Sequence, residues 1–133
     1  MEVTLLLCDA AQEANGKLYV LGGGWKSVLP DTPFNMALAI LIEVPWDQTN
    51  RKIKLTSVLM TDDGDPVEAP SGGVIEAAGD LEVGRPPGIK PGTGINVPIA
   101  LSFNGVSLPA GGYRWEVHID ETMIASAPFR AGA

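Results

Sequence analysis

The chain has 133 residues, of which 45% are hydrophobic, a size and composition that suit one domain over residues 1–133 with a substantial core. Its 9 Lys and Arg against 16 Asp and Glu give a formal net charge of −7, which leaves no basic stripe for nucleic acid or for an anionic membrane surface. One cysteine, Cys8, excludes an intramolecular disulfide, and no apolar run reaches the roughly 20 residues of a membrane span, so we expect a cytoplasmic protein.

The first part of the chain predicts two short strands. Residues 3–8 are apolar on both faces and form the first strand. Residues 9–16 form a polar connection that ends in the turn signal Asn15-Gly16, and a second strand over 17–21 follows as the return arm of a hairpin.

Three glycines at 22–24 come next. A phosphate-binding loop needs a lysine directly after its last glycine and then a helix, whereas here Trp25 intervenes and Pro30 and Pro33 follow. We therefore expect a β-bulge or a crossing point, where glycines let two backbones approach closely.

The stretch over residues 36–67 organises the rest of the chain. Its first part, residues 36–44, is the longest apolar run, and a strand that is apolar on both faces is usually central in a sheet. A polar run full of turn formers, residues 45–51, leads to a second apolar strand over 52–61. We expect these two strands to pair as a β-hairpin.

An acidic turn and a further strand follow. Residues 62–66 read Asp-Asp-Gly-Asp-Pro, a tight turn whose spacing does not match a calcium-binding loop, so we assign no metal. Residues 74–83 predict a strand. The proline-rich residues 84–92 predict a stiff connection that crosses from one sheet to the other.

The C-terminal part alternates most clearly between apolar and polar residues. Residues 95–103 predict an edge strand, because Pro98 cannot donate to a ladder, and residues 113–120 and 123–130 predict a final hairpin. About eight or nine strands without a convincing helix predict an all-β fold, an antiparallel β-sandwich that is Ig-like or jelly-roll. A closed β-barrel is the alternative.

Two residues invite a catalytic interpretation. His118 is the one histidine, and strand alternation places it on a face with Glu116 and Asp120, where acid–base chemistry would require that the three line a cleft. On an open sheet face they are simply solvated, which we favour. Cys8 lies in an apolar strand and is interpreted as a small buried hydrophobe. We assign no catalytic residue and no cofactor.

Two tryptophans stand beside loops rich in turn formers. Such tryptophans are enriched at recognition sites. The candidate ligand or partner contacts are accordingly Trp25, Trp46, Asp47, Gln48 and Asn50. The alternative is that each tryptophan caps one end of the sandwich core.

Four segments carry a family resemblance. They are CDAAQEANGKLYVLGGGW at 8–25, LIEVPWDQTNRK at 41–52, LEVGRPPGIKPGT at 81–93 and PAGGYRWEVHID at 109–120. Together they resemble an uncharacterised family of small bacterial proteins, classed as a domain of unknown function. The resemblance implies a stand-alone cytoplasmic domain of bacterial origin and brings no activity, cofactor or catalytic residue.

Our leading hypothesis is a non-enzymatic protein-interaction or structural module, with a protein partner or self-association through an edge strand or a tryptophan patch. The second hypothesis is a small-ligand or carbohydrate-binding domain, which requires Trp25 and Trp46 to lie at one end of the domain. The third is an enzyme with a carboxylate–histidine site at Glu116, His118 and Asp120.

Overall fold

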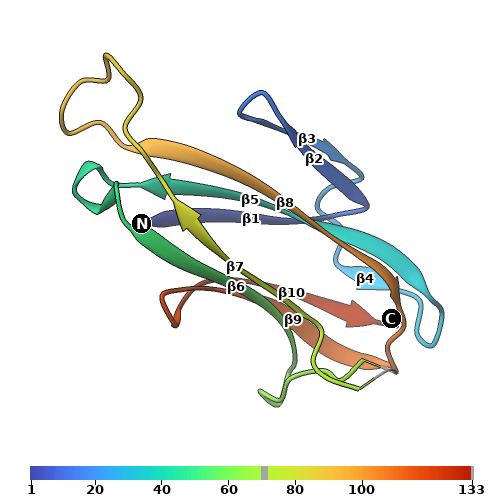
Figure 1. The fold of residues 1–133 in the computed structure, drawn as a ribbon. Helices are drawn as coiled ribbons and strands as arrows, with labels where there is room; N and C mark the ends of the chain where they lie inside the picture. Colours follow the sequence, from blue (N-terminus) through green and yellow to red (C-terminus); the bar gives the residue numbers. More distant parts are fainter. Residues whose placement is uncertain (70–71, 133) are drawn as a thin grey trace.

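The computed structural model describes residues 1–69 and 72–132, and it consists of two stacked β-sheets with a small hairpin outside one of them (Figure 1). In chain order the strands are β1 (Glu2–Cys8), β2 (Ala10–Ala14), β3 (Lys17–Leu21), β4 (Ser27–Val28), β5 (Phe34–Val44), β6 (Lys52–Thr61), β7 (Glu76–Glu82), β8 (Ile95–Val106), β9 (Gly111–Ile119) and β10 (Thr122–Ala131). A short 3-10 helix, η1 (Trp46–Gln48), follows β5.

The three-stranded sheet has the order β1-β5-β8, and all its pairs are antiparallel. The five-stranded sheet has the order β4-β10-β9-β6-β7, in which the pair of β4 and β10 is parallel. Strands β2 and β3 form the separate hairpin. Within the described ranges no helix is long and apolar enough to cross a membrane.

Both large sheets contribute to one core. Leu38 and Ile40 of β5 and Trp115 and Val117 of β9 are all 0% exposed. Phe103 of β8 contacts Trp115 with the ring centroids 4.5 Å apart, and this contact joins the two sheets. The predicted β-sandwich is confirmed. The barrel alternative is wrong for the described residues, because each large sheet ends on two edge strands.

β5 is the central strand of its sheet, as its pattern predicts. Its inner face enters the sandwich core, and its outer residues Ala37 and Ala39 are also buried. They pack with Cys8 under Ala11 and Leu18 of the β2–β3 hairpin. A strand covered on both faces in this way needs apolar residues at consecutive positions.

The predicted hairpin of β5 and β6 is wrong. β5 pairs with β1 and β8, whereas β6 pairs with β7 and β9 in the other sheet. Residues 45–51, with η1 among them, therefore cross between two sheets, which lie about 10 Å apart in a sandwich. The turn-forming residues predict that the chain changes direction after β5. Which sheet β6 then joins depends on where the apolar face of β6 can be buried.

The Asn15-Gly16 turn is confirmed, with φ values of 53° and 74°. Its first arm differs from the prediction, because residues 10–14 form strand β2 and not a polar connection. At the following glycines two backbones do approach closely, because the N–H of Gly24 donates to the carbonyl oxygen of Leu7 at 2.8 Å. An added Cβ at Gly23 would lie 2.8 Å from Leu6 Cδ2.

Three later predictions are confirmed. β8, which contains Pro98, lies at the edge of its sheet. Residues 83–94 connect β7 in one sheet with β8 in the other. β9 and β10 pair as a hairpin, with Asp120 at φ 50° and Glu121 at φ 70° in the turn.

Candidate functional site

Trp25 lies at one end of the core. Its ring meets Phe34 and Phe129 edge-on, with centroid separations of 6.3 Å and 5.4 Å. Its Nε1 is buried and has no hydrogen-bond partner among the described residues. Since the indole is half-buried against other aromatic rings, it closes this end of the sandwich and offers little free ring surface.

Trp46 is held in a different way, by Arg85 of the loop after β7. The guanidinium carbon of Arg85 lies 3.7 Å from the indole centroid, a cation–π contact. Arg85 Nε also donates to Thr49 Oγ1 at 2.7 Å, and its Nη2 donates to the carbonyl oxygen of Trp46 at 2.8 Å. These contacts fasten η1 to the loop after β7 and cover one face of the indole.

The two tryptophans lie at opposite ends of β5. Trp25 contacts Phe34, the first residue of β5, whereas Trp46 comes two residues after its last residue, Val44. An extended strand of this length, 11 residues, separates its ends by roughly 33 Å. The requirement that both indoles share one end of the domain is therefore not met.

The polar residues predicted beside Trp46 have separate roles. Asp47 lines a hollow next to the indole. Gln48 Oε1 accepts from Arg51 Nη2 at 3.3 Å, so this amide supports the turn. Asn50 has a φ of 60°, and its N–H donates to the carbonyl oxygen of Val83 at 2.7 Å, which ties the turn to the end of β7. Of these three, Asp47 is the residue that faces free space beside Trp46.

The hollow beside Trp46 has a volume of about 490 Å³ and an acidic lining. Glu2 of β1 and Glu43 of β5 are directly opposite each other in the ladder, and like charges in that arrangement destabilise strand pairing. A Cβ at Gly94 would lie 3.0 Å from Glu43 Oε1, so the glycine leaves room for this carboxylate. The residues around the hollow are Met1, Glu2, Glu43, Pro45, Trp46, Asp47, Gly92 and Gly94.

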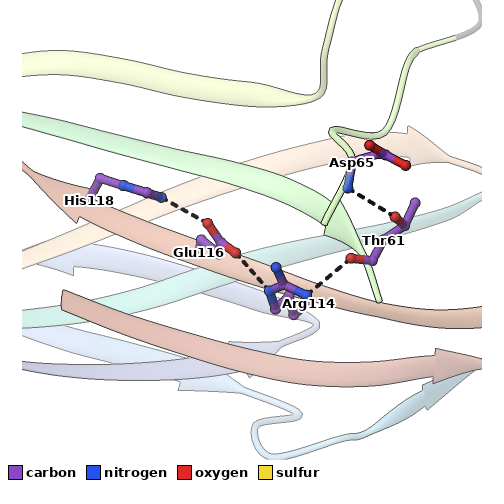
Figure 2. Close-up of polar contacts among 5 residues, drawn as sticks. All are labelled: Thr61, Asp65, Arg114, Glu116 and His118. Atoms are coloured by element: carbon purple, nitrogen blue, oxygen red, sulfur yellow. Dashed lines mark hydrogen bonds and ion pairs between the residues drawn. The ribbon is translucent and has the colours of Figure 1, made fainter. Parts of the chain in front are cut away.

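A polar ladder runs along the outer face of β9 (Figure 2). Arg114 Nε donates to Glu116 Oε2 at 2.7 Å, and His118 Nε2 lies 2.9 Å from Glu116 Oε1. Because a carboxylate only accepts, Nε2 of His118 carries the proton. Arg114 Nη1 also donates to the carbonyl oxygen of Thr61 at 3.1 Å, and Thr61 Oγ1 accepts from the N–H of Asp65 at 3.2 Å. The ladder thus connects β9 to the acidic turn after β6.

Glu116 is 7% exposed, which is unusual for a carboxylate on the outer face of a sheet. Burial by itself raises the pKa of its carboxyl group, but hydrogen bonds from His118 and Arg114, together with their charges, outweigh burial and hold the pKa below its ordinary value. Glu116 is therefore a satisfied, ionised centre that fixes its two neighbours.

The predicted trio of Glu116, His118 and Asp120 is only partly assembled. Asp120 follows the end of β9 and has a φ of 50°, so it does not continue the strand. Its carboxylate accepts hydrogen bonds from the N–H of Lys54 at 3.0 Å and from Arg51 Nη1 at 2.9 Å, and these bonds close the turn after β9. These two donors lower the pKa of Asp120. His118 and Glu116 lie in a shallow groove of about 320 Å³ on the open sheet face, and not in the cleft that acid–base chemistry requires.

Cys8 is 0% exposed, and its Sγ donates to the carbonyl oxygen of Ala37 at 3.3 Å. Burial, and next the charge of Asp9, raise the pKa of the thiol. A thiol in these surroundings is a poor nucleophile and packs as a small apolar residue.

The sandwich is open along one side, between the edge strands β7 and β8. Inner residues Ile99 and Leu101 of β8 are half-buried, although their ladder partners Ile40 and Leu38 on β5 are 0% exposed. An apolar slot of about 140 Å³ lies between the two strands. It is lined by Leu55, Ala77, Ala78, Gly79, Leu81, Ile99 and Leu101.

Sequence reasoning did not find this slot, although the sequence carries a signal for it. Residues 77–79 read Ala-Ala-Gly within a strand, so β7 presents almost no side-chain volume to the large aliphatic residues of β8. Small residues on one strand and large ones across the core indicate a gap only when it is known that the two strands face each other. That relation is a property of the fold.

Comparison with known families identifies a match. The model of the Family of unknown function (DUF6941) matches residues 3–132, which is nearly the whole chain. No curated protein matches this chain.

Proposed function

Since the chain belongs to this family of unknown function, we propose from its geometry that it is a non-enzymatic protein-interaction module whose partner covers the open side between β7 and β8. One observation carries this proposal. The apolar slot is bordered by two edge strands, and each of them has a strand neighbour on one side only among the described residues. Apolar surface beside unpaired backbone groups is the usual basis for recognition by another chain.

The same proposal places the module in a bacterial cytoplasm. Cys8 is a free, buried thiol, which suits a reducing compartment. The net charge of −7 favours a basic partner surface over an acidic one.

Site-specific photocrosslinking in living cells tests the proposal. A photoreactive side chain at Ala78, which lines the slot, should form a covalent product with a partner, whereas one at Ser126, an exposed residue on β10, should not. The substitution Ala77→Leu fills the slot and should abolish the product from position 78. Equal products from both positions, or no effect of Ala77→Leu, would reject the proposal.

A second candidate function is binding of a carbohydrate or another small polyol in the hollow beside Trp46. The observation that favours it is an indole with one face held by Arg85, next to the carboxylates of Glu2, Glu43 and Asp47. Carboxylates accept hydrogen bonds from hydroxyl groups, and an indole stacks on the apolar face of a sugar ring.

Isothermal titration calorimetry with a panel of oligosaccharides tests this second function. Trp46→Ala should remove any binding, and Asp47→Asn should weaken it. Trp25→Phe is the matched control, because Trp25 lies at the other end of β5. Heat signals that persist in Trp46→Ala would place the ligand elsewhere.

A further inference from the structure

We infer that the partner binds the open side as a β-strand that pairs with β7, an inference that rests on the proposed function. This strand carries apolar residues at alternate positions, with lysine or arginine between them. The inference specifies the chemistry of the partner.

β7 has the better edge for an added strand. It pairs with β6 through Glu76–Glu82, and its other edge has no strand neighbour among the described residues. Alternate residues of such an edge direct N–H and C=O groups outward. The edge of β8 is less suitable, because Pro98 lacks an N–H and because β2 packs close to this strand.

The slot fits the side chains of an added strand. An extended segment places every second side chain on one face, and beside β7 that face would point at Ile99 and Leu101. Gly79 is exposed, and an added Cβ there would meet no atom within 4 Å, so the backbone of β7 is open to approach at its centre. The slot of about 140 Å³ accommodates one or two aliphatic side chains of the partner.

Charge selects between a second copy of this chain and a basic segment. The outer face of β7 carries Glu76, Asp80 and Glu82, all exposed. Lys54 and Lys52 of β6 lie opposite the last two in the ladder, but none of the three carboxylates forms an ion pair within the described part of the chain. Antiparallel pairing of β7 with β7 of a second copy, centred on Gly79, would put Glu76 opposite Glu82, which is repulsive. Lysine or arginine at the corresponding positions of a partner strand would be attractive.

A synthetic peptide of about nine residues, in which valine alternates with lysine, spans β7 and serves as the probe. Wild-type protein should bind it, and hydrogen exchange should slow at the outward-pointing amides of residues 76–82, which do not pair with β6. A peptide with valine and glutamate should bind at least about tenfold more weakly, because it meets the carboxylates of β7. An analogue N-methylated on alternate residues should not bind, because it cannot pair with the edge.

Ala77→Leu should weaken binding of the valine–lysine peptide by about tenfold or more, because the larger side chain occupies the slot. Ala10→Leu, the same change at an exposed strand residue outside the slot, is the control and should not weaken it. The peptide comparisons use the wild-type chain, so they decide the question even if a variant does not fold.

The outcomes separate the two proposals. If the N-methylated analogue binds as well as the parent, or if the outward-pointing amides of residues 76–82 stay unprotected, strand addition is refuted. An effect of Ala77→Leu would still support a partner on this side. If Ala77→Leu changes neither peptide binding nor the crosslink from position 78, both proposals fail. Equal binding of the glutamate peptide would refute the basic partner. A dimer that dissociates when the peptide is added would show that a second copy occupies the edge.

Discussion

Replacing Glu116 by glutamine tests whether the polar ladder on β9 is a charged stabilising unit. The substitution Glu116→Gln keeps the size of the side chain but removes the negative charge that Arg114 and His118 share. Gln can accept at one oxygen only, so one of the two donors loses its acceptor. We expect the folded state to be destabilised at pH 7.

The magnitude follows from the burial of the three groups. Breaking a fully buried ion pair costs about 3–5 kcal/mol. Here the side chains of Arg114 and His118 are 30% and 27% exposed, so water screens the loss and we expect about 2 kcal/mol. For 133 residues, an unfolding entropy of about 0.28 kcal/mol per kelvin converts this into a fall in Tm of roughly 7 °C.

The pH dependence has a definite sign. In the folded state the pKa of Glu116 is lowered, since the bonds from His118 and Arg114 outweigh the effect of burial. The stabilisation is therefore complete above the unfolded pKa of about 4.3 and is lost as the pH falls through the folded pKa. The free energy gap between wild type and Glu116→Gln should persist at pH 5 and should shrink below about pH 4.

Urea unfolding at pH 7, 5 and 3, monitored by the intrinsic fluorescence of the tryptophans, among them the buried Trp115, measures this gap. Glu82→Gln, at an exposed strand residue, is the matched control and should change stability by no more than about 0.5 kcal/mol. If Glu116→Gln matches wild type at pH 7, or if the gap widens toward pH 3, the account of Glu116 as an ionised centre is wrong.

Three further predictions concern packing and the Trp46 loop. Ser57 is 0% exposed and its Oγ has no hydrogen-bond partner in the described structure. Ser57→Ala should therefore raise the free energy of unfolding by about 1 kcal/mol in a urea titration. Ser102→Ala, at an exposed strand residue, is the control and should leave it unchanged. Arg85→Ala removes the guanidinium from the indole and should make Trp46 more accessible to iodide quenching, measured in a variant in which Trp46 is the one remaining tryptophan. Unchanged quenching would contradict the stacking. Gly23→Val should cost no more than about 1 kcal/mol, because the exposed side chain of Leu6 can turn away from the added side chain; a fall in Tm of more than about 4 °C would contradict this.

Local signals predicted many elements correctly. Asn15-Gly16 forms a turn because both residues tolerate positive φ, and Pro98 lies on an edge strand because it lacks a donor. Residues 84–92 cross between sheets because a proline-rich run does not pair in either one. Each of these results depends on the chemistry of a few adjacent residues.

The candidate site was less predictable from sequence. Both tryptophans stand beside loops, and in both the indole contacts other residues of the chain, Phe34 and Phe129 for Trp25 and Arg85 for Trp46. The pattern that made them candidates, an aromatic residue next to turn formers, is the same whether the ring is free or packed. Only the partners in space distinguish the two cases, and Asp47 is the predicted polar neighbour that lies beside a hollow.

Alternation of apolar and polar residues, with the positions of glycine and proline, by itself determined that this chain is all-β, where most strands run and that β5 is central. These properties follow from the two-residue period of a strand and from the conformational limits of single residues. Only the tertiary structure decided that β5 and β6 belong to different sheets, that residues 10–14 pair with 17–21, and that the side between β7 and β8 stays open. Strand pairing and facing are set by contacts between distant segments, and the same apolar face can be buried against more than one partner until the whole core is assembled.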